Sequence, residues 1–359
     1  MWSALPLADI VRRRILKAEA RSLFEVADRQ WEIAPKQETT TPPAYCLPNQ
    51  LDRIVDWIFS QGHPRQVVAG GTHAVHAATR AFLLKDAYLI DGVIYKGNAT
   101  AYLHHRIKRV PQLDVEHVID RGSVYSTFPG NRYFGQWLMD DCVTYPLAAA
   151  EGTPVSTAQP IARHSPGREG HTPGYEQRLG MRPSRLASAY FRELVIFDDV
   201  GQNESKRARW GALGQKLVAP LDVKPHPGVF IIRGGTGERR VLKNELEIAE
   251  HLRAKRGFRV VDVREADVAT LIQTCAGAQT VVGVEGSHLI HGIVLLPEGG
   301  SVLTLQPPKR FCPILKDLTD RDRQNFGFVL GTPEGDDLVV DVTEVERTLD
   351  LFPAIRSGQ

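Results

Sequence analysis

The sequence has no surplus of charge of one sign and no long hydrophobic segment. Its 44 lysines and arginines almost balance 42 aspartates and glutamates, which gives a net charge of +2. Binding to a phosphate backbone needs a clustered positive surface, so we expect no nucleic-acid partner. No apolar run approaches the ~20 residues that span a bilayer, and the first residues lack the pattern of a signal peptide. We therefore expect a cytoplasmic protein without a transmembrane segment.

Cysteine is also scarce, and its spacing fits neither a disulfide framework nor a zinc site. The four cysteines are far apart and form no C-x-x-C pair: Cys46, Cys142, Cys275 and Cys312. Three of them lie in apolar surroundings, so we expect buried thiols in a reducing compartment. Four histidines are close in sequence but lack a carboxylate or cysteine partner at a metal-binding spacing: His73, His76, His104 and His105. These patterns predict neither a metal site nor a bound cofactor.

Residues 229–307 contain the clearest structural pattern in the chain, an alternation of short apolar segments with helical ones. The predicted strands are residues 229–232, 258–263, 280–284 and 301–305. The predicted helices are residues 245–252, 267–276 and 289–296. Short apolar strands that alternate with helices predict a parallel β-sheet covered on both faces, and therefore an α/β fold.

Two of these predicted strands end in residues that are suited to bind a diphosphate. Arg233 and two glycines follow the first strand, and Arg239 and Arg240 come a few residues later. The third strand runs through Gly283 into the sequence Glu-Gly-Ser-His at residues 285–288. Ligands of such sheets bind at the carboxyl ends of the strands, where a glycine turn offers backbone N–H groups and arginines offer charge. Each segment alone favours a plain turn with solvated arginines, but both together in one βα unit favour a phosphate site.

The residues at these strand ends resemble a signature of glycosyltransferase family 61. The matching residues are Arg233, Arg239–Arg240, Asn244–Glu245 and the segment 283–289. A second match lies upstream, where Tyr-Phe-Gly-Gln-Trp-Leu-Met-Asp at residues 133–140 is similar to the family's aromatic-Gly-His-Trp-Leu-x-Asp motif. The family includes bacterial capsule-type transferases, plant xylan arabinosyl- and xylosyltransferases, and the EGF-domain O-GlcNAc transferase.

Three positions depart from the family pattern. Gln136 stands where the family usually has histidine, and Glu285 stands where many members have histidine. Lys243 is an extra residue before Asn244, so either of the two preceding arginines can take the family role. These departures concern the acceptor side and the catalytic base more than the fold.

The resemblance implies a GT-B fold, in which two Rossmann-like domains face one cleft, and an inverting transfer without a metal. It implies a nucleotide-sugar donor, which we expect to be linked to uridine diphosphate, and a glycan or other hydroxyl acceptor. Hexosyl or pentosyl transfer in polysaccharide biosynthesis would fit this family. The implied donor-binding residues are Arg233, Arg239, Arg240, Asn244, Glu245, Gly286, Ser287 and His288.

An inverting transfer also needs a base that takes the proton of the acceptor hydroxyl. Asp140 is the first candidate and Asp141 the second, and Glu285 is a third, although a carboxylate beside a diphosphate would repel it. From the residues alone, a plain helix with its tryptophan in the core is the stronger interpretation of this stretch, whereas the resemblance favours a functional acid. The acceptor-binding candidates from the same stretch are Tyr133, Gln136 and Trp137.

Residues 151–184 contain five prolines and five glycines and predict a long interdomain loop. The predicted domains are an acceptor-side domain over residues 1–165 and a nucleotide-sugar-binding, Rossmann-like domain over residues 166–330. A C-terminal strand and helix over residues 331–359 could pack back on the first domain. Two other functions stay open: a nicotinamide-dependent oxidoreductase, suggested by the glycine turn after residue 233, and a non-catalytic nucleotide-sugar or glycan-binding protein, suggested by the missing family histidines.

Overall fold

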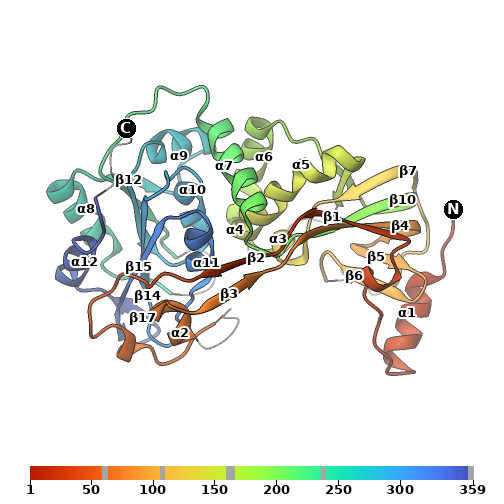
Figure 1. Cartoon of the computed structure of the whole chain (residues 1–359), viewed down its shortest axis with the longest axis horizontal. Coiled ribbons are helices and arrows are strands. Elements are labelled where there is room, and N and C mark those ends of the chain that lie inside the picture. The colour runs from red at the N-terminus through yellow and green to blue at the C-terminus, as the bar shows by residue number, and fades with distance from the viewer. Residues whose placement is uncertain (59–63, 106–109, 159–165, 236–239, 355–359) are drawn as a thin grey trace. The chain divides into compact units, whose positions relative to one another are not determined.

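The computed structural model describes residues 1–58, 64–105, 110–158, 166–235 and 240–354 (Figure 1). The chain forms two compact units. The first unit comprises residues 1–36, 77–165 and 180–201, and the second comprises residues 37–76, 166–179 and 202–359. These units differ in composition from the predicted domains. Residues 37–76, predicted in the first domain, belong to the second unit, and residues 180–201, predicted in the second domain, belong to the first. The C-terminal segment after residue 330 belongs to the second unit. The α/β class is confirmed, whereas the GT-B arrangement stays a prediction.

The first unit is built on a mixed sheet with the strand order β6-β5-β4-β10-β7-β8-β9, in which β1 also pairs with β4. Strands β4 and β10 are antiparallel, whereas β10, β7, β8 and β9 are parallel to one another. The strands are β1 (Arg29–Ala34), β4 (Thr79–Ile90), β5 (Val93–Lys96), β6 (Ala99–Tyr102), β7 (His117–Val124), β8 (Thr153–Thr157), β9 (Ser184–Leu186) and β10 (Ser188–Asp198). The helices outside the segment after β7 are α1 (Leu5–Arg14) and the 3-10 turn η1 (Phe24–Val26).

Strand β4 explains how this sheet is buried on both faces. Its side chains alternate, so Phe82 and Leu84 join one apolar cluster, whereas Ala81 and Leu83 join another. The antiparallel partner β10 alternates in the same way, because Leu194 lies opposite Leu84 in the ladder and enters the first cluster. The period of two therefore places a core on each side of the central strand pair.

The segment after β7 is helical but irregular. It consists of α3 (Phe128–Arg132), α4 (Phe134–Gln136), a π-helical turn η3 (Trp137–Asp141) and α5 (Cys142–Glu151). In the π turn the N–H of Cys142 donates to the carbonyl of Trp137, five residues earlier. Such turns insert one extra residue into a helix and are frequent at functional sites.

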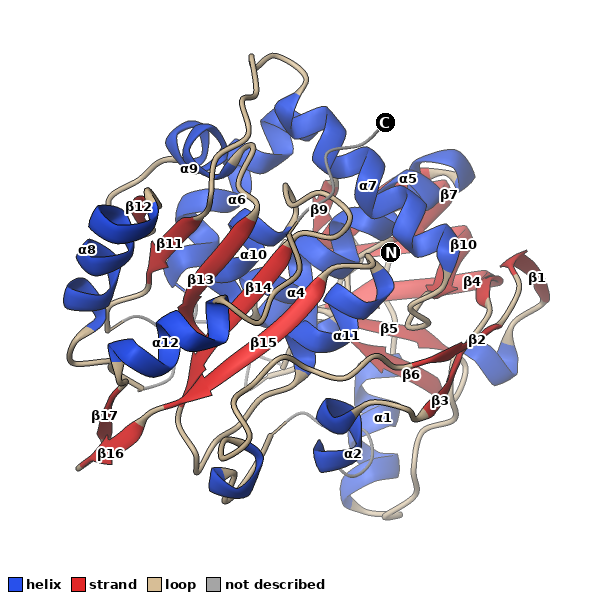
Figure 2. Cartoon of the chain, turned by 60° about the vertical axis from the view of Figure 1, so that its left-hand side comes forward, coloured by secondary structure: helices blue, strands red, loops and turns tan. Residues whose placement is uncertain are grey.

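The second unit contains a five-stranded sheet whose neighbouring strands are all parallel (Figure 2). Its strands are β11 (Val229–Ile232), β12 (Arg259–Asp262), β13 (Thr280–Val284), β14 (Ser301–Gln306) and β15 (Asn325–Leu330). Their order is β12-β11-β13-β14-β15, so the chain leaves β11 toward one edge and then returns to build the other side. The order reverses between β11 and β13, which is the point where doubly wound sheets bind ligands.

Helices cover both faces of this sheet. Phe230 and Val282 point to the face where α8 (Glu245–Arg256) and α12 (Val342–Leu349) pack. Ile231 and Val281 point the other way, toward Gly292 of α10 (Ile290–Ile293). A Cβ atom at Gly292 would lie 2.8 Å from Val281 and 3.0 Å from Ile231, so the absence of a side chain lets α10 approach the sheet.

The second unit contains further helices and two short two-stranded sheets. The helices are η2 (Leu51–Arg53), α2 (Pro64–Ala69), α6 (Pro166–Leu179), α7 (Glu204–Val218), α9 (Val268–Cys275), η4 (Ser287–Leu289) and α11 (Ile314–Arg321). The two-stranded sheets pair β2 (Gln37–Thr40) with β3 (His73–His76), and β16 (Thr332–Glu334) with β17 (Asp337–Val339).

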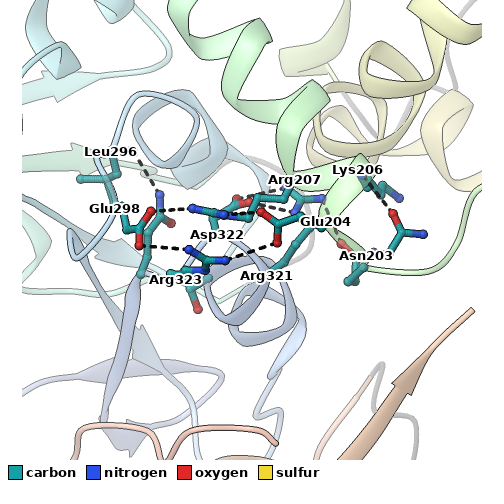
Figure 3. A network of polar contacts seen from close by, with 12 residues as sticks. Asn203, Glu204, Lys206, Arg207, Leu296, Glu298, Arg321, Asp322 and Arg323 are labelled. Carbon is teal, nitrogen blue, oxygen red and sulfur yellow. Dashed lines mark hydrogen bonds and ion pairs between the residues drawn. The ribbon is translucent and has the colours of Figure 1, made fainter. Parts of the chain in front are cut away.

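A polar network ties α7 to the end of α11 (Figure 3). Arg207 of α7 contacts Glu204 in its own first turn and Glu298 in the connection before β14. Arg323 contacts the same two carboxylates, at 3.5 Å from each. Because Glu298 precedes β14 and Arg323 precedes β15, this network lies at the amino edge of the sheet, away from the carboxyl ends of the strands.

Part of the predicted interdomain loop is helical. Helix α6 contains Pro173 and three glycines, yet it forms because its residues are buried by packing, among them Tyr175 and Leu179. Tertiary packing outweighs a poor intrinsic helix propensity here. All four cysteines are free thiols, and three of them, Cys142, Cys275 and Cys312, are buried. In the part of the chain that the structure describes, no helix has both the length and the apolar composition to cross a membrane.

Candidate active site

Charged side chains from distant parts of the sequence meet at the carboxyl edge of the five-stranded sheet. Arg233 follows the last residue of β11, and Glu285 follows the last residue of β13. Arg240 belongs to the connection before α8, and Arg310 to the loop after β14. We call Arg233, Arg240 and Arg310 the arginine cluster. Since β11 and β13 flank the switch point of the sheet, the cluster lies where a ligand of this fold binds.

Glu245 fixes the turn at the end of β11. This first residue of α8 is buried, and its two carboxylate oxygens accept the backbone N–H groups of Arg233 and Gly234, each at 2.8 Å. Burial raises the pKa of the Glu245 carboxyl, and the two backbone hydrogen bonds oppose that rise. Glu245 therefore holds Arg233 through the main chain, while the guanidinium group makes separate contacts, among them the one with the Arg240 carbonyl.

Glu285 lies between two members of the arginine cluster. Its carboxylate is 3.1 Å from the guanidinium of Arg240 and 3.1 Å from that of Arg310. The Nε of Arg240 also donates to the backbone carbonyl of Glu285 at 2.9 Å. Arg233 in turn donates to the carbonyl of Arg240 at 3.2 Å. The result is a continuous chain of contacts across the ends of β11 and β13.

Positive charge is concentrated in the cluster. Its three guanidinium groups lie with the carboxylates of Glu245 and Glu285. Arg233 is 3% exposed, and burial together with the charge of Arg240 lowers its pKa from 12.5 to about 10, against the opposing effect of the two carboxylates. It remains charged at neutral pH in a poorly hydrated place. An anion bound beside it would relieve this unfavourable state, which is typical of a ligand site.

Gly286 and His288 complete the end of β13. Gly286 has a φ of +155°, and a Cβ atom there would lie 3.1 Å from the Arg240 guanidinium and 3.2 Å from His288 Nδ1. Only glycine fits this backbone conformation and this close approach. Burial, with the charges of Arg233 and Arg240, holds the pKa of His288 well below 6.5, so its imidazole is neutral. A neutral ring beside arginines can still donate or accept a hydrogen bond from a ligand.

The helix expected after Gly286 is shorter than predicted. Instead of one helix over residues 289–296, Ser287 opens a single 3-10 turn and α10 then has only four residues. A helix of this length has a weak dipole, so the arginine side chains are the stronger source of positive charge at this edge. Asn244 precedes α8 without a side-chain capping bond, and its amide pairs with the backbone of Val340, at 2.9 Å and 3.2 Å. Arg239 lies outside the described residues.

Sequence reasoning missed two further arginines at this edge, Arg310 and Arg264. Arg264 donates from its backbone N–H and from Nε to Asp262, both at 2.9 Å, at the end of β12. Its guanidinium lies against Gly234, where an added Cβ would be 2.8 Å away. An acid at the end of the second strand of such a sheet is a recognisable signal, since Rossmann-like folds often use it for a ribose. No local pattern marks Arg310.

In the first unit, the two adjacent acids of the upstream motif have different surroundings. Asp141 is fully buried and accepts the backbone N–H of Thr127 at 3.1 Å and its hydroxyl at 2.8 Å. Thr127 also caps α3, because its hydroxyl oxygen accepts the N–H of Gly130 at 3.0 Å. A Cβ atom at Gly130 would lie 2.1 Å from the Asp141 carboxylate, so α3 rests directly on this acid. Asp141 thus anchors α3 to the π turn.

Asp140 and the acceptor candidates lie on the same π turn and the residues before it. Asp140, Gln136 and Tyr133 are half-buried, and the guanidinium of Arg132 lies 5.0 Å from the centre of the Tyr133 ring. Trp137 is only 1% exposed and packs against Phe134, with ring centroids 5.8 Å apart. The indole of Trp137 is therefore part of the core, and the candidates with accessible surface are Asp140, Gln136 and Tyr133.

Comparison with known proteins identifies the family of the chain. Among the described residues, no group of three or more histidine, cysteine, aspartate or glutamate side chains is arranged to hold a metal ion. The family model described as Glycosyltransferase 61 matches residues 78–303, well over half of the 359-residue chain. No curated protein matches the sequence. The matched segment contains both the upstream motif and the residues after β11 and β13.

Proposed function

The chain belongs to glycosyltransferase family 61, and we propose that this glycosyltransferase moves a hexosyl or pentosyl group from a uridine-diphosphate sugar to a hydroxyl acceptor, with inversion and without a metal. The acceptor is a glycan or a related hydroxyl compound of polysaccharide biosynthesis, and the reaction takes place in the cytoplasm. The arginine cluster at the carboxyl edge of the sheet carries this proposal. Membership of the family argues against the nicotinamide-dependent oxidoreductase.

Cleavage of the bond between sugar and diphosphate leaves negative charge on the departing nucleoside diphosphate. In this proposal, Arg233 and Arg240 meet that charge with fixed guanidinium groups, which need no reorganisation during the reaction. The position of both side chains at the ends of β11 and β13 and the lowered pKa of the buried Arg233 support this role. The neutral His288 imidazole donates a further hydrogen bond to a phosphate oxygen. Arg239, Asn244, Gly286 and Ser287 complete the proposed donor-binding set.

Glu245 has an indirect part in donor binding. Its carboxylate occupies the backbone N–H groups of Arg233 and Gly234, which cannot then bind phosphate themselves. We assign it the role of a positioning residue that fixes the direction of Arg233. This assignment explains why a carboxylate is tolerated so close to an anion site: its two oxygens accept the backbone N–H groups of Arg233 and Gly234.

The acceptor side of the proposal rests on the upstream motif. We assign the base to Asp140, because the adjacent Asp141 is buried and occupied by Thr127. Glu285 is the weaker candidate, since both neighbouring arginines already share its carboxylate. Tyr133 and Gln136 are the proposed acceptor contacts, and the buried Trp137 supports the turn that presents them.

A panel of uridine-diphosphate sugars, each with and without glycan acceptors, tests the proposal. We expect acceptor-dependent release of uridine diphosphate in the presence of EDTA, and a product whose anomeric proton coupling shows inversion. Arg240→Ala should abolish release. Nucleotide-sugar binding without any release, with every acceptor class tried, would support a non-catalytic binding protein instead. Release with retained anomeric configuration would contradict the inverting mechanism and the role of Asp140.

A further inference from the structure

The loop that carries Arg310, residues 307–312, is held rigidly on both sides. At its base, the buried amide of Gln306 accepts the backbone N–H of Cys312 at 2.7 Å and donates to the Cys312 carbonyl at 3.2 Å. Along its length the loop pairs with residues 55–58, and Phe311 donates its N–H to the carbonyl of Asp56 at 2.9 Å. A side chain on such a loop is positioned before any ligand arrives, so binding orders little further structure.

The side chain of Arg310 is itself fixed by Glu285. Its guanidinium donates to the Glu285 carboxylate at 3.1 Å, and the side chain is 21% exposed, against 6% for Glu285. The same carboxylate is 3.1 Å from Arg240. One buried acid therefore aligns two guanidinium groups from different loops, while Arg310 keeps part of its surface open. The charge of Arg310 also contributes to the lowered pKa of Arg233, which places the two cations in one electrostatic environment.

We propose that Arg310 is a third phosphate-binding arginine of the donor site, and that Glu285 is the positioning residue that holds it there. The inference rests on the proposed donor site and extends it beyond the matched family segment, which ends at residue 303. It also gives a function to the acid at a position where histidine is common in the family. A neutral histidine offers a single acceptor lone pair, whereas the Oε2 atom of Glu285 carries charge and lies 3.1 Å from both guanidinium groups.

Titration calorimetry with two probes, uridine diphosphate and inorganic pyrophosphate, tests this inference in the full-length protein without divalent ions. Arg310→Ala should weaken binding of both probes about 10–100-fold, as expected for loss of charge-assisted hydrogen bonds. Arg310→Lys keeps the charge but not the forked donor geometry, so its affinity for each probe should lie between that of the wild type and that of Arg310→Ala. The matched control is Lys309→Ala, which removes the neighbouring exposed cation and should leave affinity unchanged.

A double-mutant cycle separates positioning by Glu285 from its general charge. Glu285→Gln removes a negative charge near the probe, but it also releases Arg310. In that background Arg310→Ala should weaken binding only a few-fold, because the guanidinium is no longer held in place. A full loss in both backgrounds would overturn the positioning role. Melting temperatures of all variants identify any that fail to fold, and Arg310→Lys then carries the test.

The outcomes also distinguish this inference from the proposed function. Wild-type protein that binds pyrophosphate but not uridine diphosphate would contradict the nucleotide donor, while the pyrophosphate titrations still decide the role of Arg310. Equal affinity of wild type and Arg310→Ala for both probes would overturn the inference and leave the donor site standing. An equal loss in Lys309→Ala would also overturn it, because the effect would then be one of general charge. If the wild-type protein binds neither probe, both the proposed function and the inference on Arg310 are wrong.

Discussion

Replacing Arg233 by methionine should stabilise the fold and abolish donor binding at the same time. The lowering of the Arg233 pKa from 12.5 to about 10 measures how unfavourable its charge is in the folded chain. At 1.36 kcal/mol per pH unit, this lowering corresponds to roughly 3 kcal/mol at neutral pH. Methionine fills a similar volume with a flexible apolar chain and removes that penalty.

The gain is reduced by what the substitution takes away. The hydrogen bond from Arg233 to the Arg240 carbonyl, at 3.2 Å, contributes about 1 kcal/mol, and the carbonyl loses a partner. We therefore expect Arg233→Met to raise the free energy of unfolding by about 1–2 kcal/mol, which for a unit of ~200 residues raises the melting temperature by roughly 2–8 °C. Such a trade between stability and function is common at binding sites.

Thermal and urea unfolding, each with and without uridine diphosphate, provide the assay. Uridine diphosphate should raise the melting temperature of the wild type but not that of Arg233→Met. Arg253→Met is the matched control, because this arginine of α8 is exposed and forms a surface pair with Glu250, so its loss should change stability by less than about 0.5 kcal/mol. If Arg233→Met is several kcal/mol less stable than wild type, Arg233 has a structural role and the reasoning fails. A preserved response to uridine diphosphate would refute it as well.

Two further predictions concern the acids of the π turn and the buried histidines. Asp141→Asn should lower the free energy of unfolding by about 1–3 kcal/mol, because the Thr127 N–H lies 3.1 Å from one carboxylate oxygen and 3.3 Å from the other, and the amide nitrogen that replaces one of them cannot accept it. Asp140→Asn should destabilise less and instead lower transfer by about 10²–10⁴-fold. Denaturation and kcat measured on the same samples separate the two acids, and wild-type transfer by folded Asp140→Asn would move the base elsewhere. His288 and His291 are held neutral by burial, with pKa values well below 6.5, so the unfolded chain takes up protons below pH 6.5 that the fold excludes. Each of these two histidines should therefore lower the free energy of unfolding by about 1.4 kcal/mol per pH unit as the pH falls below 6.5. His291→Gln should remove one of these two contributions. If the free energy of unfolding of the variant and of the wild type falls with the same slope between pH 6.5 and 5, the prediction is wrong.

The sequence predicts the second unit well because its signals are local. Strands β11 and β13 have the predicted bounds, since each is a short apolar run that ends in charged or glycine residues. Arg233 and Glu285 could be placed at one edge of a sheet from strand order alone. The helix predicted over residues 267–276 is present as α9, and Asp267 caps it by accepting the N–H of Thr270 at 2.7 Å.

What the sequence could not show depends on contacts between distant segments. Arg310 joins Glu285 only because the loop after β14 folds back on the end of β13, and nothing in its neighbourhood marks it. Helix α6 is rich in proline and glycine and forms through burial of residues such as Tyr175. The different surroundings of the two acids at 140 and 141 also follow from packing, because α3 closes over Asp141.

Calorimetric titration of wild-type protein with uridine diphosphate, in EDTA and then with added Mn²⁺, tests the central claim most directly. The arginine cluster should bind the nucleoside diphosphate in EDTA with the same affinity as in Mn²⁺. The affinity should fall as salt rises, because the attraction is between charges. Binding that is absent in EDTA and appears only with Mn²⁺ would show that a metal ion, and not the arginine cluster, carries the donor diphosphate.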